Sequence, residues 1–142
     1  MAARLGYAAT MDRWIGTAPS AADIEAIARA SLERLPEPFA SHLRDVVLTV
    51  EEFADDETLR AMGIDDPFEL TGLYHGLPLG DKSVELSGTL PDRIFLYRRA
   101  ILDEWAAEGE TLEHLVHHIT VHEVGHHFGL SDEEMHALED QA

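Results

Sequence analysis

Apolar residues recur at helical spacing in several stretches of the chain. One stretch begins after Ser20, whose side chain can accept a hydrogen bond from a first-turn amide, and it is ended by Pro36 and Pro38. The same spacing predicts helices over residues 55–62, 99–107 and 111–128, and a last short helix after Ser131. We therefore expect helices at both ends of residues 20–142.

Short β-branched and aromatic runs between these helices predict strands at Val46–Val50, Ser83–Leu86 and Arg93–Tyr97. In the last of these runs, apolar side chains fall on both faces. Residues 63–81 are rich in Gly and Pro, so we expect mostly loop there, with a short extended piece near Leu73 and Tyr74. Helices and strands do not alternate regularly, which favours an α+β fold over a doubly wound sheet.

The length of 142 residues and the hydrophobic fraction of 45% fit one compact domain. We expect this single domain to span residues 20–142. Residues 1–19 are expected to form a flexible N-terminal arm, because they are rich in Ala but lack the continuous apolar segment of a signal peptide.

The chain carries 28 acidic and 10 basic side chains, so its formal charge is −18. Nucleic acids and anionic membrane surfaces are therefore not expected partners, because both are bound through basic surfaces. No cysteine is present, so disulfides are excluded and any zinc ion must be bound by His and carboxylate side chains. The absence of cysteine also agrees with a cytoplasmic location.

The chemistry of the chain is concentrated in residues 122–132, which read H-E-V-G-H-H-F-G-L-S-D. His122 and His126 lie one helical turn apart and can bind the same ion. Glu123, beside the first of them, can take a proton from a metal-bound water. Gly129 allows the helix to end and the chain to turn back, so that Asp132 can become a third ligand. This pattern predicts a zinc peptidase site with one coordination position left open.

Other residues near the end of the chain could compete with Asp132 for the third ligand position. Glu133, Glu134 and His136 all lie within a turn of it. Glu134 is better placed as the capping-box partner of Ser131, at the start of the last helix. His136 lies a full turn past Asp132, which makes Asp132 the preferred ligand.

Further histidines extend the motif helix on its N-terminal side. His114 and His118 continue the four-residue spacing of His122, but a straight helix rotates by about 40° for each such step. We therefore expect them to drift off the zinc face, with His118 facing the sheet or hydrogen-bonding a carboxylate, and we keep a second metal site or a proton relay as the alternative. His117 and His127 are expected at the surface or as groups that support the ligands.

Several polar residues outside the motif are candidates for substrate contacts. Arg98 and Arg99 could bind a substrate carboxylate or an oxyanion, but ion pairs with the many acidic residues of the chain are favoured. Tyr74 and Tyr97 are possible oxyanion donors. His75 lies in a Gly-rich loop and could line a cleft.

Three stretches, Gly72–Leu79, Leu90–Arg99 and His122–Glu134, resemble the small zincin-like metallopeptidases of bacteria, sometimes called minimal zincins. The likeness extends over most of residues 20–138. It implies a zincin-like fold, in which a small mixed sheet packs against helices and the motif helix lies beneath an edge strand. An aspartate as third ligand is similar to the snapalysin type, whereas metzincins usually carry histidine there and a Met-turn further downstream.

The mechanism expected from these residues is hydrolysis of a peptide bond by a water activated on Zn²⁺. His122, His126 and Asp132 would hold the ion, and Glu123 would act as general base. The peptide or protein substrate would extend along the Arg93–Tyr97 strand at the sheet edge. A catalytically silent, metal-stabilised peptide-binding module is the alternative, and a hydrolase of non-peptide amides is a third possibility.

Overall fold

The computed structural model describes residues 16–76 and 91–142. The elements in chain order are α2 (Ala21–Glu33), α3 (Phe39–His42), β1 (Val47–Glu51), α4 (Asp56–Met62), the 3₁₀ helix η2 (Pro67–Glu69), β2 (Gly72–His75), β3 (Arg93–Tyr97), α5 (Arg98–Glu108), α6 (Leu112–Phe128) and α7 (Asp132–Gln141). The strand predicted at residues 83–86, and residues 1–15 of the predicted arm, lie outside the described residues.

The helices begin where the local sequence signals place them. Ser20 caps α2, and Thr111 accepts a hydrogen bond from the His114 amide at the start of α6. Ser131 and Glu134 form a capping box at the start of α7. Each of these side chains satisfies amide groups that the first helical turn leaves without a partner. The predicted helix starts are therefore confirmed.

The three strands form one mixed sheet in the order β1–β3–β2. β1 runs parallel to β3, and β2 runs antiparallel to it. The extended piece expected near Leu73 and Tyr74 is thus a regular edge strand, and Val46–Val50 is confirmed with its bounds moved by one residue. The small mixed sheet on helices confirms the predicted α+β class.

The position of β3 corrects one expectation. We expected Arg93–Tyr97 to offer a free edge to substrate, but this strand lies in the centre of the sheet, where β1 and β2 occupy both of its edges. A central strand is covered on both faces, which explains why apolar side chains alternate on both sides of it. Among the described strands, the edges are β1 and β2.

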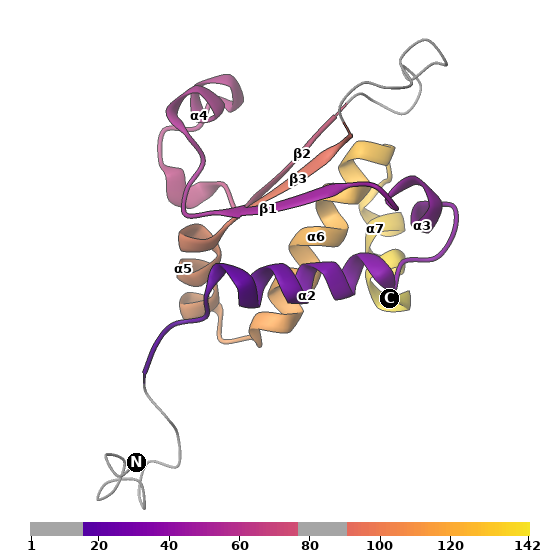
Figure 1. The fold of residues 1–142 in the computed structure, drawn as a ribbon, viewed down its shortest axis with the longest axis horizontal. Helices are drawn as coiled ribbons and strands as arrows, with labels where there is room; N and C mark the ends of the chain where they lie inside the picture. The colour runs from indigo at the N-terminus through magenta and orange to yellow at the C-terminus, as the bar shows by residue number, and fades with distance from the viewer. Residues whose placement is uncertain (1–15, 77–90) are drawn as a thin grey trace, which may run out of the picture.

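The two faces of the sheet are covered by different helices (Figure 1). On one face, Ile94 and Leu96 are fully buried in the main core, together with residues of α2 and α6. On the other face, Tyr97 packs with Leu59 of α4 in a smaller apolar cluster. Figure 1 shows α2, α6 and α7 on one side of the sheet and α4 on the other. Within the described residues, no helix combines the length and apolar character that crossing a bilayer requires.

Two glycines allow the motif helix to be approached closely from two sides. A Cβ atom at Gly125 of α6 would collide with the side chain of Met135 in α7. A Cβ atom at Gly72 of β2 would lie 3.0 Å from Ile119 Cγ2 and 3.3 Å from Glu123 Cγ. The absence of side chains at these positions therefore lets α7 and β2 pack directly against α6.

Candidate metal centre

The motif residues lie on the last turns of α6. This helix ends at Phe128, where Gly129 adopts a φ of 72° in the left-handed region and its amide bonds to the His126 carbonyl. The Leu130 amide bonds to the Gly125 carbonyl, which closes the helix end. The chain then reverses, and α7 runs back along α6 (Figure 1).

Glu123 points from α6 toward the edge strand β2. Its Oε1 atom accepts a hydrogen bond of 3.1 Å from the backbone N–H of Tyr74. Burial raises the pKa of Glu123 to about 7, although the bond from Tyr74 acts in the opposite direction. A carboxylate with a pKa near neutrality is well matched to accept and return a proton at neutral pH.

His122 offers a lone pair in a protected position. Its Nε2 atom is buried and has no hydrogen-bond partner among the described residues, and Glu139 Oε1 lies 3.6 Å away. Burial and the neighbouring His118 lower the pKa of His122, which favours the neutral form of the imidazole. A neutral imidazole with an unused, buried nitrogen is the state in which histidine binds a metal ion. The donor chemistry at this position therefore fits a zinc ion.

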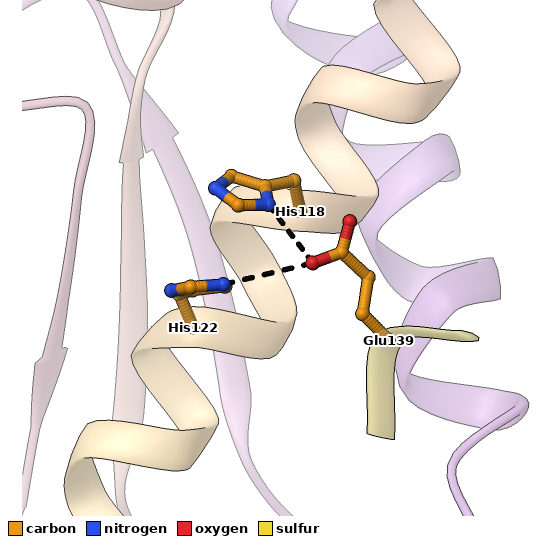
Figure 2. Close-up of side chains that lie close together, drawn as sticks. All are labelled: His118, His122 and Glu139. Carbon is orange, nitrogen blue, oxygen red and sulfur yellow. Dashed lines mark hydrogen bonds and ion pairs between the residues drawn. The ribbon is translucent and has the colours of Figure 1, made fainter. Parts of the chain in front are cut away.

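Figure 2 shows the side chains that gather at this nitrogen. His118 Nδ1 lies 2.9 Å from Glu139 Oε1, the same oxygen that faces His122. One donor atom from each of His118, His122 and Glu139 lies within 4.8 Å of the other two. In the part of the chain that the structure describes, this is the one group of three or more His, Asp or Glu residues close enough to share an ion.

Two of the predicted ligands lie outside that group. His126 is exposed one turn beyond His122, and the centroids of the two rings are 6.3 Å apart. Asp132 is exposed at the first position of α7. The structure thus places His122 and His126 on adjacent turns of one helix, whereas Asp132 reaches the same end of α6 through the turn at Gly129 but does not join the cluster of donor atoms.

Residues 43–142 match the model of the zincin-like metallopeptidase family, which is more than two thirds of the chain. The chain belongs to the zincin-like metallopeptidase family. A search of the curated proteins finds no match. Membership of this family agrees with the donor set on α6, and it confirms the resemblance inferred from the three sequence stretches.

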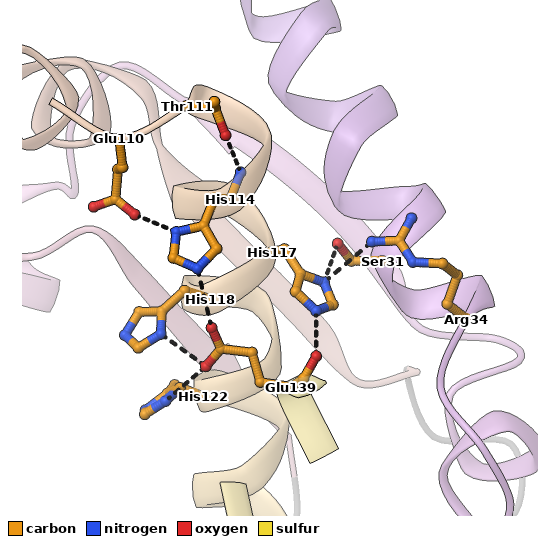
Figure 3. Close-up of polar contacts among 9 residues, drawn as sticks. All are labelled: Ser31, Arg34, Glu110, Thr111, His114, His117, His118, His122 and Glu139. Atoms are coloured by element: carbon orange, nitrogen blue, oxygen red, sulfur yellow. Dashed lines mark hydrogen bonds and ion pairs between the residues drawn. The ribbon is translucent and has the colours of Figure 1, made fainter. Parts of the chain in front are cut away.

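In this zincin-like chain, Glu139 is the residue that sequence reasoning missed. Its carboxylate faces three histidines of α6 (Figure 3). His114 Nε2 lies 3.7 Å from Oε2, whereas His118 and His122 face Oε1. The available signal was its position seven residues after Asp132, on the same face of α7. The expectation that His118 hydrogen-bonds a carboxylate is confirmed, and Glu139 is that carboxylate.

His117 supports the cluster of His118, His122 and Glu139 through the backbone of Glu139. Its ring is buried between α2 and α7, with Nδ1 at 2.8 Å from Ser31 Oγ and Nε2 at 3.1 Å from the Glu139 carbonyl oxygen. Arg34 lies 3.3 Å from the same Nδ1 (Figure 3). Of the two roles considered for His117, the structure shows the supporting one, because it fixes the backbone that carries Glu139.

A second polar group fastens β2 to the end of α6. The Tyr74 hydroxyl donates to Asp92 Oδ2 at 2.9 Å, and the Tyr74 ring stacks on His127 with centroids 3.9 Å apart. His127 Nε2 lies 3.5 Å from the same carboxylate oxygen. Burial and the bond to Asp92 raise the pKa of Tyr74 above its ordinary value. The Tyr74 hydroxyl thus helps to hold β2, the strand whose Tyr74 amide bonds to Glu123.

The remaining candidates have other surroundings. Arg98 and Arg99 both bind Glu52 at 2.9 Å, as expected for ion pairs within the chain. Burial raises the pKa of Tyr97 to about 12, and its ring packs in the apolar cluster beside α4. His75 is exposed and lines a cavity of about 650 Å³ on that same side of the sheet.

Proposed function

We propose that the chain is a zinc-dependent peptidase in which His122, His126 and Asp132 hold the ion and Glu123 is the general base. The observation that carries this proposal is the pairing, on adjacent residues, of a buried imidazole nitrogen that has no hydrogen-bond partner among the described residues and a half-buried carboxyl group whose pKa is about 7. A bound zinc ion supplies an activated water and polarises the scissile carbonyl group.

Glu123 is supported as the base by its place on the helix. Residues advance by about 100° per position, so Glu123 lies about 80° from the direction midway between His122 and His126. At this angle its carboxylate would be placed to take a proton from the attacking water and to deliver it to the leaving amine. The Tyr74 amide orients the carboxylate and leaves its second oxygen for this transfer.

The edge strand β2 supports an extended peptide as substrate. The Tyr74 amide points away from β3, toward Glu123, so the outer edge of β2 faces the catalytic carboxylate. Gly72 shares that edge because alternate residues of a strand direct their backbone groups to the same side. A peptide paired with this edge would bring its carbonyl groups past Glu123. The charge of −18 favours neutral or cationic peptides.

The test compares Glu123→Gln with Glu113→Gln, an exposed position on the same helix. We expect Glu123→Gln to retain zinc and to lose about 100-fold or more of kcat/KM on peptide libraries, because a positioned base contributes about 10²–10⁴. Glu113→Gln should match the wild type, and a chelator should abolish cleavage.

Equal cleavage by the wild type and Glu123→Gln would remove Glu123 from the mechanism. Zinc-dependent peptide binding with no cleavage of any peptide would instead favour the binding module, and cleavage of simple amides alone would favour the non-peptide hydrolase. Mass spectrometry of the reaction products distinguishes these outcomes.

A further inference from the structure

We propose that His118, His122 and Glu139 form a second zinc position that overlaps the catalytic one through His122 and holds the ion away from Glu123. This inference rests on the proposed function in taking His122, His126 and Asp132 as the catalytic position. The chain would then have two alternative states with one bound ion, of which only one is active.

The distances in the cluster suit a tetrahedral zinc ion. Ligand atoms that each lie about 2.1 Å from zinc are about 3.4 Å from one another in a tetrahedral arrangement. Glu139 Oε1 lies 2.9 Å from His118 Nδ1 and 3.6 Å from His122 Nε2, values that bracket this separation. Two imidazoles and a carboxylate are also the ligand types that zinc accepts.

Glu139 is held in place for this role. Its backbone carbonyl is bound by the buried His117, and its other carboxylate oxygen faces His114 at 3.7 Å. His114 is itself paired with Glu110 through a contact of 2.6 Å. Histidine and carboxylate neighbours of this kind orient the groups that ligate a metal. The side chain of Glu139 is only 12% exposed, so few other orientations are open to it.

An ion at this position lies outside the reach of the base. Glu123 lies about 120° around the helix from the direction midway between His118 and His122, compared with about 80° for the catalytic pair. Its carboxylate bonds to β2, whereas Glu139 approaches α6 from α7. Glu123 would therefore not serve as the base for a water on this ion.

The two positions exclude each other because they use the same atom. His122 Nε2 has one lone pair and faces Glu139 in the structure. We therefore expect one zinc ion per chain rather than two. The distribution between the positions would set the active fraction of the protein.

The test measures zinc affinity by competition with a chromophoric chelator in variants of the full chain. His126→Asn with Asp132→Asn removes the catalytic ligands at two exposed positions, so the fold should be retained. We expect this double variant still to bind one zinc ion. Adding Glu139→Gln should weaken binding at least ten-fold, whereas adding Asp140→Asn, an exposed neighbour with the same change of charge, should leave it within two-fold.

The proposal is overturned if the double variant binds no zinc, or if Glu139→Gln and Asp140→Asn have equal effects. Two zinc ions bound to the wild-type chain would overturn the sharing of His122. Circular dichroism confirms that each variant is folded. Because the readout is affinity without hydrolysis, a failure of the Glu123 experiment leaves this result standing, and the reverse also holds.

Discussion

The carboxyl groups on the two sides of α6 have opposite kinds of surroundings. On the side of β2, Glu123 is half-buried, it accepts a hydrogen bond from a backbone amide, and burial raises its pKa to about 7. On the side of α7, Glu139 is surrounded by the imidazoles of His114, His118 and His122. One helix thus separates a carboxylate suited to proton transfer from one suited to binding cations.

The separation depends on what each neighbour supplies. A strand presents an amide and apolar side chains, so a carboxylate facing it loses hydration and gains a proton more readily. A helix packed antiparallel presents side chains at every turn, so it can place one carboxylate against a row of histidines. The position of a residue around α6 therefore decides its chemistry as much as its type does.

The strongest way to break this comparison is to remove His122 Nε2, the nitrogen that both proposed zinc positions use. Zinc at 1,000-fold excess over its dissociation constant should stabilise the wild-type chain by about 4 kcal/mol. His122→Asn should lose this stabilisation almost completely, whereas His118→Asn and His126→Asn should each keep part of it. Thermal unfolding with zinc and with a chelator measures the difference. A full zinc effect in His122→Asn would show that the ion is bound elsewhere.

A second experiment sharpens the side of β2 through pH. Glu123 has a pKa of about 7 in the folded chain and an ordinary pKa of 4.5. Below about pH 4.5 it is protonated in both the folded and the unfolded chain, so it does not lower the unfolding free energy there. As pH rises toward 7, the unfolded chain ionises first, and the folded state loses stability. Between pH 4.5 and 8, the unfolding free energy of the metal-free wild type should therefore fall by on the order of 2–3 kcal/mol relative to that of Glu123→Gln.

Urea unfolding of the two proteins at each pH gives that difference directly. The other ionisable groups are the same in both proteins, so the comparison reports on Glu123. A constant difference across this range would mean that Glu123 ionises as an ordinary carboxyl group.

The smallest expected effect concerns the attachment of β2. Tyr74→Phe removes the hydroxyl that donates to Asp92 but keeps the ring that stacks on His127. We expect a loss of about 1 kcal/mol in unfolding free energy, the usual value of one such hydrogen bond. In chemical unfolding, zinc should raise the unfolding free energy of Tyr74→Phe by the same amount as that of the wild type. A reduced increment would connect this strand to the metal position.

Local signals in the sequence were enough for the longer helices α2, α4, α5, α6 and α7 and for the motif, but not for the short α3 and η2. Ser20, Thr111 and Ser131 cap their helices because a cap depends on residues three positions away. The order of the strands depends on pairing between distant segments, and the pattern of β3 was compatible with an edge or a centre. Both of its faces are apolar, which is the feature that should have favoured the centre.

The same reasoning explains what was missed at the site. His122, Glu123 and His126 lie in one short segment, so their spacing is visible in the sequence. The contact of Glu139 with His118 requires α7 to lie closely along α6, and that approach depends on Gly125 meeting Met135. No local pattern connects residues that are 21 positions apart.

The close approach at Gly125 adds a steric requirement to the motif of residues 122–126. The two residues between Glu123 and His126 are conventionally written as unspecified, yet here Val124 is fully buried in the core and Gly125 has no room for a Cβ atom. One faces inward to the core and the other faces the returning helix. Substituting either would alter the surroundings of His122 and His126, the proposed ligands, without changing these residues themselves, so the shorthand conceals two steric requirements of this chain.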